Sequence, residues 1–289
     1  MSSKSRQANK PPKPGKEKPK KKTLAEKADK FECYQKSVQA PDHEVEFFEQ
    51  AYRDVNRSKP MLLREDFCGT FAVCCEWVKS SPGRSATGVD LCEETLQWGR
   101  DHNLSQLQPS EAARVKLIQQ DVRKRNRPQV DVLAAQNFSF WIFKTRASLL
   151  EYFKIARANL KAGGIMVMDM MGGGDCFIEE QTDKRKVGAG KKAFKYHWEQ
   201  ASFNPVNYDA SFYISFRFSD GSKLKRAFAY HWRFWSIPEV RELLAEAGFK
   251  ESHVYWEDED ESGEDTGTWS RTDRAPSTPC WVSYIVAVK

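Results

Sequence analysis

Between residues 61 and 170, short apolar runs alternate with longer segments of helical periodicity, and this alternation constrains the fold more than any other feature of the sequence. The apolar runs predict five strands, at residues 61–63, 86–91, 115–118, 130–135 and 165–170. The other segments predict helices, at about 43–56, 71–78, 93–102 and 146–160, with Ala162, Gly163 and Gly164 ending the last one. Such alternation predicts a parallel sheet with helices on both faces. Ligands of these sheets bind beyond the carboxyl ends of the strands.

Polar residues follow the ends of four consecutive predicted strands. Glu65 and Gly69 follow the first strand, Asp90 the second, Asp121 the third and Asn137 the fourth. Glycine allows a ligand to approach the backbone closely, and the helix that begins nearby offers free N–H groups. Asp90 lies 21 residues beyond Gly69, close to the spacing of about 20 residues at which an acid accepts hydrogen bonds from a ribose. The alternative role for Glu65 is stabilisation of the helix dipole.

The pattern changes after residue 172. Residues 172–192 are rich in glycine and charge and predict a loop, and residues 193–236 predict two or three antiparallel strands with a hairpin turn at Asp220-Gly221. Residues 172–236 therefore form an antiparallel insert after the fifth strand. The rest of the chain predicts a helix at 237–247, strands at about 250–256 and 281–288, and an acidic loop at 257–265.

The positive charge of the chain is concentrated at its N-terminus. Residues 1–30 carry 11 Lys or Arg and 3 Asp or Glu, a net charge of +8, which leaves −2 for residues 31–289. The first segment has almost no large apolar residues, so we expect residues 1–30 to be a disordered basic tail and residues 31–289 to form one domain. The Lys-rich run at 18–22 is a nuclear address, a weak nucleic-acid contact or a solubilising tail.

Cysteine and hydropathy patterns narrow the class of protein further. The seven cysteines include no CxxC pair and have no histidine at ligand spacing, which predicts reduced thiols and no metal site. No run of 18 apolar residues is present, so we expect no membrane span. We expect a cytoplasmic protein, or a nuclear one if the Lys-rich run acts as an address.

The loop from Leu63 to Thr70, together with the polar strand ends, resembles the class I S-adenosylmethionine-dependent methyltransferases. The resemblance covers residues 60–171 and extends more loosely to residues 235–249, WSIPEVRELLAEAGF, which are similar to the helix before that family's last strand pair. Residues 63–70 also resemble a bacterial subgroup of undefined substrate. The resemblance implies an α/β fold with a Rossmann-like seven-stranded sheet, helices on both faces and S-adenosylmethionine as the cofactor.

The resemblance also implies roles for individual residues. Glu65 and Gly69 would border the methionine end of the cofactor, Asp90 would hold the ribose hydroxyls, and Asn137 would lie near the reacting methyl group and position the acceptor. The complete implied cofactor set is Glu65, Cys68, Gly69, Thr70, Asp90, Leu91, Asp121, Val122, Asn137 and Phe138, with Leu91 against adenine and Asp121 accepting from its amine.

The chain departs from the family at the glycine-rich loop. That loop has three alternating glycines, whereas this chain has Phe67, Gly69 and Phe71 at those positions. The departure indicates either a reshaped loop or a pocket that no longer binds the cofactor. NAD is disfavoured as the ligand, because its fingerprint needs three glycines and only one is present.

Aromatic residues in the insert are candidates for the substrate side. Tyr196, Trp198 and Trp235 would hold an amine or its methylated cation by cation–π contact, although packing of the strands on the sheet is the better explanation for any single one of them. Tyr34 and Gln35 would belong to an N-terminal lid over the cofactor.

Three functions follow from these observations. The first is methyl transfer to a nitrogen or oxygen atom of a small molecule, by in-line attack on the cofactor methyl group, with a base needed only for a protonated acceptor. The second is nucleic-acid methylation that uses the basic tail. The third is a binding module with a methyltransferase-like fold and no catalytic activity, which Phe67 and Phe71 keep open.

Overall fold

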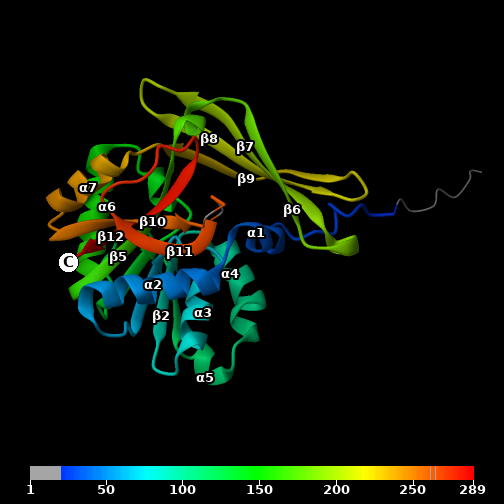
Figure 1. The fold of residues 1–289 in the computed structure, drawn as a ribbon. Helices are drawn as coiled ribbons and strands as arrows, with labels where there is room; N and C mark the ends of the chain where they lie inside the picture. The colour runs from blue at the N-terminus through cyan, green and yellow to red at the C-terminus, as the bar shows by residue number, and fades with distance from the viewer. Residues whose placement is uncertain (1–20, 261, 264) are drawn as a thin grey trace, which may run out of the picture.

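The structure, a computed structural model, describes residues 21–260, 262–263 and 265–289 and contains two β-sheets (Figure 1). The larger sheet has eight strands in the order β11-β10-β12-β5-β4-β1-β2-β3, and the smaller one has four in the order β6-β7-β8-β9. The strands of the larger sheet are β1 (Leu62–Asp66), β2 (Ser85–Asp90), β3 (Val115–Gln119), β4 (Val130–Ala135), β5 (Leu160–Gly172), β10 (Glu251–Glu259), β11 (Asp265–Thr272) and β12 (Trp281–Val288). The predicted Rossmann-like class with an antiparallel insert is confirmed.

Helices cover both faces of the larger sheet. One face packs on α2 (Pro41–Asn56), α3 (Ala72–Ser80) and α4 (Glu93–His102), and the other packs on α6 (Arg146–Asn159) and α7 (Ile237–Glu246). Strands β1 to β5 are parallel, whereas β12 and β10 run antiparallel to their neighbours. The continuous apolar run of β5 is typical of a strand that is buried on both faces. This arrangement gathers the carboxyl ends of the parallel strands at one edge.

Short polar side chains begin three of the helices. Asp29 accepts hydrogen bonds from two backbone N–H groups at the start of α1 (Lys30–Val38), Thr145 caps α6, and Ser236 forms a capping box with Glu239 at the start of α7. The remaining helical pieces are α5 (Pro109–Ala112) and 3₁₀ turns at Leu104–Gln106, Ser139–Ile142, Gly174–Phe177 and Gly190–Lys192.

Three sequence predictions need correction. The larger sheet has an eighth strand, because the first residues of the predicted acidic loop extend β10 to Glu259 and residues 265–272 form the added edge strand β11. The predicted loop 172–192 contains β6 (Gln181–Val187), whose exposed, charged residues gave no apolar alternation. Gly163 and Gly164 do not cap α6, which ends at Asn159; they lie in a bulged start of β5.

The four-stranded sheet stands over the carboxyl ends of the parallel strands (Figure 1). It consists of β6, β7 (Phe194–Asn204), β8 (Asp209–Phe218) and β9 (Lys223–Arg233), all antiparallel. Its inner face buries aromatic side chains against α1 and the core, and its outer face carries polar and charged residues. The side-chain alternation of β7 and β8 that the sequence shows therefore separates these two faces.

The predicted basic tail falls largely on residues 1–20, which lie outside the described residues. Within the described part of this segment, the chain contacts the β8–β9 turn from Leu24 onward. The Leu24 N–H donates to Asp220 Oδ2 over 2.8 Å, the Ala25 N–H donates to Ser222 Oγ over 3.0 Å, and Ala25 is buried. Among the described residues, no helix has the length and apolar character needed to cross a membrane.

Candidate cofactor and substrate site

The loop after β1 follows the backbone path that alternating glycines would permit. Phe67, Gly69 and Phe71 all have left-handed backbones, with φ of 56°, 52° and 47°. A bulky residue in this region is strained, and such strain persists only where the surroundings enforce it. The Phe71 ring is fully buried and lies where a Cβ on Gly99 of α4 would meet it at 2.4 Å, while the Phe67 ring packs against Tyr152 with centroids 5.7 Å apart. The two phenylalanines thus preserve the loop conformation.

Asp90 ties this loop to the end of β2. Its Oδ2 accepts from the Gly69 N–H and its Oδ1 from the Cys92 N–H, both over 2.8 Å. A carboxylate oxygen has two lone pairs, so each oxygen keeps one acceptor site for a ligand. The two backbone bonds fix the direction in which those free sites point.

Glu65 lies at the end of β1 and is buried. Its Oε2 accepts from the Cys74 N–H in the first turn of α3 over 3.1 Å, which is the helix-start role that the sequence left open. Burial raises the pKa of Glu65 to about 7. Glu65 also lines the cavity described next, so the two roles coexist.

A cavity of about 240 Å³ lies between the strand ends, α1 and β9. Three of its lining side chains have buried polar atoms with no hydrogen-bond partner, namely Gln39 Oε1, Thr70 Oγ1 and both amide atoms of Gln136. Buried polar atoms are nearly always paired, so this group indicates a ligand site. The lining residues are Phe31, Tyr34, Gln39, Glu65, Asp66, Phe67, Cys68, Gly69, Thr70, Asp90, Thr95, Gln136, Asn137, Ser139, Ile142, Phe228, Tyr230 and Trp232.

Asp169 supports the β4 end of the cavity, although no sequence pattern predicted a role for it. Its carboxylate accepts from the Asn137 N–H over 2.8 Å and from the Phe138 N–H over 2.9 Å, and both of these residues have left-handed backbones. Burial raises the pKa of Asp169 to about 7. An acid inside the apolar run of β5 was the signal in the sequence that could have revealed it.

The predicted cofactor residues divide into two groups. Glu65, Cys68, Gly69, Thr70, Asp90 and Asn137 all line the cavity, whereas Leu91, Asp121, Val122 and Phe138 do not. Leu91 is 65% exposed beside the site, and the Phe138 ring packs against Trp141, 5.5 Å between centroids.

Asp121 and Val122 lie just beyond the cavity. The Asp121 carboxylate is engaged by the Arg123 side chain, whose Nη2 donates to Oδ2 over 2.7 Å and whose Nε donates to Oδ1 over 3.1 Å. Hydrogen bonding from Arg123 lowers the pKa of Asp121. Val122 is buried in the core.

The three aromatic residues predicted for the substrate lie outside the cavity. Trp198 stacks on Phe212 with centroids 5.0 Å apart, Tyr196 is buried beneath the Arg185 guanidinium, and Trp235 is buried beneath that of Arg233. At these positions the three residues pack β7 and the segment after β9 into the core, and their role in substrate binding stays a prediction. The aromatic wall instead comes from β9, as Phe228, Tyr230 and Trp232.

The predicted N-terminal lid residues lie at the cavity on α1. The Tyr34 ring packs against Phe228 with centroids 4.8 Å apart, which joins α1 to β9 across the site. The Gln35 amide bonds reciprocally with Asn103, and the Asn103 Nδ2 donates to the Thr70 carbonyl over 2.8 Å. Helix α1 is therefore connected to both the aromatic side chains of β9 and the loop after β1.

Solved structures of other proteins share this architecture. Neither family models nor curated proteins match the sequence. A solved structure of an amino pentose methyltransferase from Micromonospora echinaspora, with S-adenosylmethionine bound, aligns over 89% of this chain and 95% of its own at 14% identity and a TM-score of 0.64. An S-adenosylmethionine-dependent methyltransferase from Clostridium acetobutylicum aligns over 89% and 96% at 18% identity and a TM-score of 0.62.

A third structure, the sugar N-methyltransferase of a Streptoalloteichus species, aligns over all of this chain and 98% of its own at 14% identity and a TM-score of 0.61. At these identities the likeness shows the fold. The chain therefore has the fold of the class I S-adenosylmethionine-dependent methyltransferases.

A partly buried carboxyl group on α2 gives the fold a testable pH dependence. Burial raises the pKa of Glu44 to about 8, the neighbouring Asp169 carboxylate raises it further, and the Tyr284 hydroxyl, which donates to Glu44 Oε2 over 3.2 Å, opposes the shift. Because this pKa exceeds the ordinary value of 4.5, the folded chain keeps a proton that the unfolded chain loses across this window. The free energy of unfolding therefore falls as pH rises through it.

Glu44→Gln is expected to remove this contribution. Near pH 9 the variant should be more stable than the native chain by about 2 kcal/mol, while near pH 4 the two should differ little. Urea unfolding at both pH values measures the difference. Glu46→Gln, at an exposed position of the same helix, is the control and should leave the pH dependence unchanged. Parallel pH profiles for Glu44→Gln and the native chain would contradict the assignment.

Proposed function

We propose that the chain transfers the methyl group of S-adenosylmethionine to a small molecule, with a nitrogen atom as the preferred acceptor. The observation that carries the proposal is the cavity at the strand ends, where unpartnered buried polar atoms lie beside Asp90 and the loop after β1. Two of the structural neighbours have names that give small substrates, an amino pentose and a sugar. Both support the proposal by likeness of fold.

The residues at the strand ends fit the cofactor. Each oxygen of Asp90 has one free lone pair to accept from a ribose hydroxyl, and exposed Leu91 beside it offers apolar surface to adenine. Asp121 Oδ2 accepts a single hydrogen bond from Arg123 and keeps a site for the adenine amine. Thr70 Oγ1, buried and unpaired in the loop, would gain a partner from the methionine end.

The charge of the cavity favours cationic and amine ligands. Its lining includes the carboxylates of Glu65, Asp66 and Asp90 and no Lys or Arg among the described residues. The bound cofactor supplies an electrophilic methyl group on a positively charged sulfonium. Carboxylates and aromatic rings stabilise such cations, whereas the phosphates of a nucleic acid would be repelled. This balance favours a small amine over a nucleic acid as the acceptor.

The chain contributes positioning and exclusion of water. Phe228 and Trp232 of β9, with Phe31 of α1, form an apolar wall opposite the strand ends. An amine attacks through its lone pair once it is aligned, so an amine that binds as the ammonium ion must first lose its proton, whereas a neutral amine needs no general base. Gln136 has a free amide oxygen and a free amide nitrogen in the cavity and would orient the acceptor by accepting or donating a hydrogen bond, with Asn137 as its neighbour.

Radiolabel transfer from methyl-labelled S-adenosylmethionine tests the proposal. The full chain is incubated with pools of small amines, small alcohols or total RNA, and label is counted in acid-soluble and acid-precipitated fractions. The proposal expects label in the soluble amine pool. Label confined to RNA would select the nucleic-acid methyltransferase, and the absence of label from every pool, with the cofactor bound, would select the binding module.

Gln136→Leu tests the role of Gln136 in methyl transfer separately from its effect on the stability of the fold. Leucine removes an unpaired buried amide, so the variant should be about 1 kcal/mol more stable than the native chain, while methyl transfer to the amine falls by about tenfold or more. The matched control is Gln200→Leu, also buried, whose Nε2 donates to the Cys176 and Ile178 carbonyls. That control should lose stability. Unchanged kcat/KM in Gln136→Leu would remove Gln136 from the site.

A further inference from the structure

Four cationic side chains lie in register across the outer face of the four-stranded sheet. Lys186 pairs with Lys195, Lys195 with Arg217, and Arg217 with Lys223, one from each strand. All four are exposed. Since neighbouring strands lie about 4.8 Å apart, this cationic row spans about 14 Å.

The cationic row costs stability in the isolated chain. Like charges directly opposite each other on a sheet are destabilising. Lysines on the edge strands β6 and β9 would guard against edge-to-edge pairing, but Lys195 and Arg217 lie on the inner strands. Among the described residues, no carboxylate forms a salt bridge with Lys186, Lys195, Arg217 or Lys223. An external anion would relieve this repulsion.

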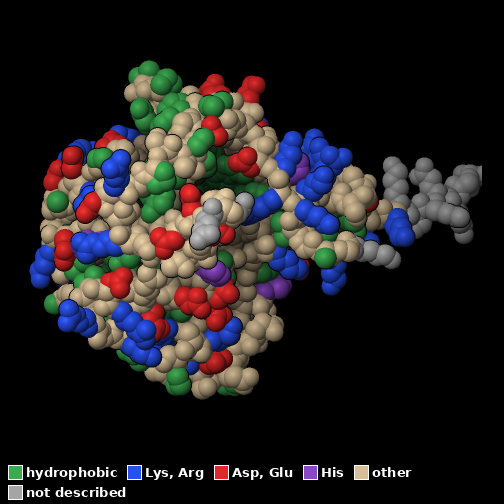
Figure 2. All heavy atoms as spheres, in the orientation of Figure 1, with side chains coloured by type: hydrophobic (Ala, Val, Ile, Leu, Met, Phe, Trp, Pro, Cys, Tyr) green, Lys and Arg blue, Asp and Glu red, His purple; other side chains and the backbone are tan. Residues whose placement is uncertain are grey.

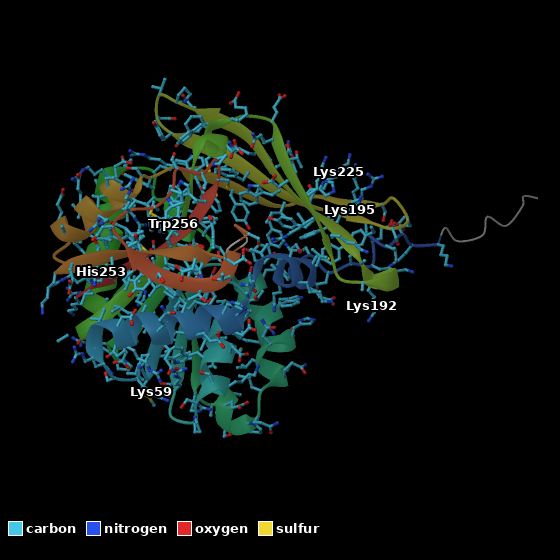
Figure 3. All side chains as sticks on the ribbon, viewed as in Figure 1. Lys59, Lys192, Lys195, Lys225, His253 and Trp256 are labelled. Atoms are coloured by element: carbon cyan, nitrogen blue, oxygen red, sulfur yellow. The ribbon has the colours of Figure 1, made fainter. Side chains whose placement is uncertain are left out.

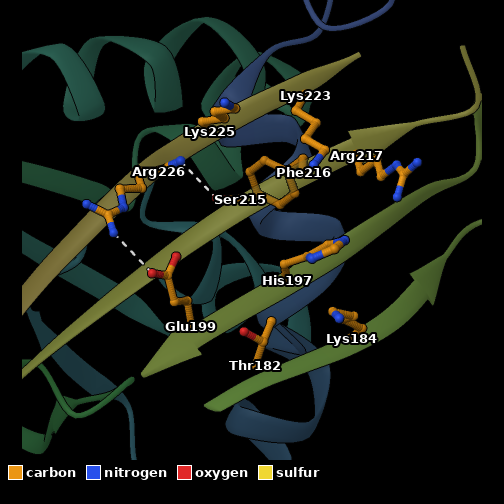
Figure 4. Close-up of a pocket in the computed structure, with 10 residues that line it drawn as sticks. All are labelled: Thr182, Lys184, His197, Glu199, Ser215, Phe216, Arg217, Lys223, Lys225 and Arg226. Carbon is orange, nitrogen blue, oxygen red and sulfur yellow. Dashed lines mark hydrogen bonds and ion pairs between the residues drawn. The ribbon is translucent and has the colours of Figure 1, made fainter. Parts of the chain in front are cut away.

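The cationic row lies between two hollows that meet at Arg217. One, of about 430 Å³, is shown in Figure 4 and is lined by Lys184, Arg217, Lys223, Lys225 and Arg226 among others. The other, of about 410 Å³, is lined by Lys186, Lys195 and Arg217. The first contains a single carboxylate, that of Glu199, which is paired with Arg226 over 3.1 Å. Both hollows are therefore strongly positive.

A buried imidazole atom in the first hollow also lacks a partner. His197, opposite Lys184 and Ser215 on neighbouring strands, has no hydrogen-bond partner for its Nε2, which is shielded from solvent. Figure 4 shows its ring among the cationic side chains of the hollow. An oxygen of a bound anion would give this nitrogen a partner when it carries a proton.

The N-terminal segment adds charge at the same end of the sheet. The contacts of Leu24 and Ala25 with the β8–β9 turn hold the segment there, and Lys22, which precedes them, is exposed. Figure 2 shows blue side chains gathered on this part of the molecule, and Figure 3 labels Lys192, Lys195 and Lys225 on it. The positive surface thus continues from the cationic row toward the N-terminus.

We propose that the outer face of the four-stranded sheet binds the phosphate backbone of a nucleic acid. A row of regularly spaced cations between two positive hollows matches a strand of phosphates, whereas the cores of protein interfaces are depleted in lysine. The inner face of the same sheet covers the acidic cavity, so this surface is separate from the methyl-transfer site. The proposal does not depend on the cofactor.

Fluorescence anisotropy with a labelled single-stranded RNA of about 20 nucleotides and mixed sequence tests the proposal. The full chain should bind it, and the logarithm of the association constant should fall with the logarithm of salt concentration with a slope of about −3, as expected for four phosphate contacts. Arg217→Glu should weaken binding by about tenfold or more and make the slope shallower by about 1. Its unfolding temperature should stay the same or rise, because the introduced carboxylate would face Lys195 and Lys223.

Two controls decide whether the cationic row itself is responsible. Lys116→Glu replaces a cation by an acid at an exposed position of β3 and should leave RNA affinity within about threefold of the native chain. Equal losses in the two variants would overturn the proposal by showing a response to net charge alone.

Poly-glutamate of matched length should bind the native chain more weakly than RNA. Equal or tighter binding of poly-glutamate would overturn it in favour of an acidic protein partner.

Discussion

Asp90→Ala is expected to lower the affinity for S-adenosylmethionine by about 100-fold. Two hydrogen bonds from ribose hydroxyls to a carboxylate are together worth about 3 kcal/mol, which corresponds to that factor. The substitution also releases the Gly69 and Cys92 N–H groups, so the loop after β1 loses its fixed position. Calorimetric titration with the cofactor measures the change.

The control for this prediction is Asp101→Ala, an exposed acid on α4 whose carboxylate accepts from Gln97 of the same helix. It should bind the cofactor like the native chain. Unfolding temperatures of both variants establish that they remain folded. If Asp90→Ala bound within about threefold of the native affinity, Asp90 would have no part in the cofactor site.

Arg64→Ala is expected to destabilise the fold by about 3–5 kcal/mol, because it leaves the buried Asp66 carboxylate without its counter-charge. The Arg64 Nε donates to Asp66 Oδ1 over 2.6 Å, and both side chains are almost fully buried. The same guanidinium donates to the Val122 carbonyl over 2.9 Å and to Asn126 Oδ1 over 2.5 Å. It therefore also holds the loop after β3 against β1.

Urea unfolding measures this loss, and Arg146→Ala is the matched control. Arg146 pairs with Glu246 on the surface, with Nη1 and Oε2 2.9 Å apart, and both side chains are about half exposed. Exposed pairs contribute about 0.2–1 kcal/mol, so the control should change stability little. Similar small losses in both variants would contradict the importance assigned to the buried pair.

Much of the parallel sheet could be predicted because its strands and helices have clear, separate periodicities. The loop from Leu63 to Thr70 and the acid Asp90 were recognisable for a related reason, since their positions at strand ends are fixed by chain order alone. Of the predicted cofactor residues, those on or next to the first two strand ends, with Asn137, line the cavity. Local sequence spacing was sufficient to place them.

The features that were missed depend on contacts between distant segments. The cavity wall of Phe228, Tyr230 and Trp232 depends on which face of β9 turns inward, and a one-residue difference in register reverses that choice. Tyr196 and Trp235 are also aromatic residues in or next to the insert, but they lie in the core. Strands β6 and β11 are charged or polar edge strands without an apolar alternation, so nothing local distinguished them from loops.

At Phe67 and Phe71 the sequence departs from the glycine-rich loop of the family, but the backbone there has the conformation that glycine would adopt. Both adopt the left-handed conformation that glycine would, because their rings are held by packing. The burial of the Phe71 ring against α4 opposes the strain of its backbone. The loss of two glycines therefore does not argue against a cofactor site.

Calorimetric titration of the full native chain with S-adenosylmethionine is the most direct test of the central claim, that the cavity at the strand ends is a cofactor site. We expect saturable binding at one site per chain, with a dissociation constant of about 1–100 μM. Absence of heat up to about 1 mM cofactor, with no rise in unfolding temperature, would contradict it.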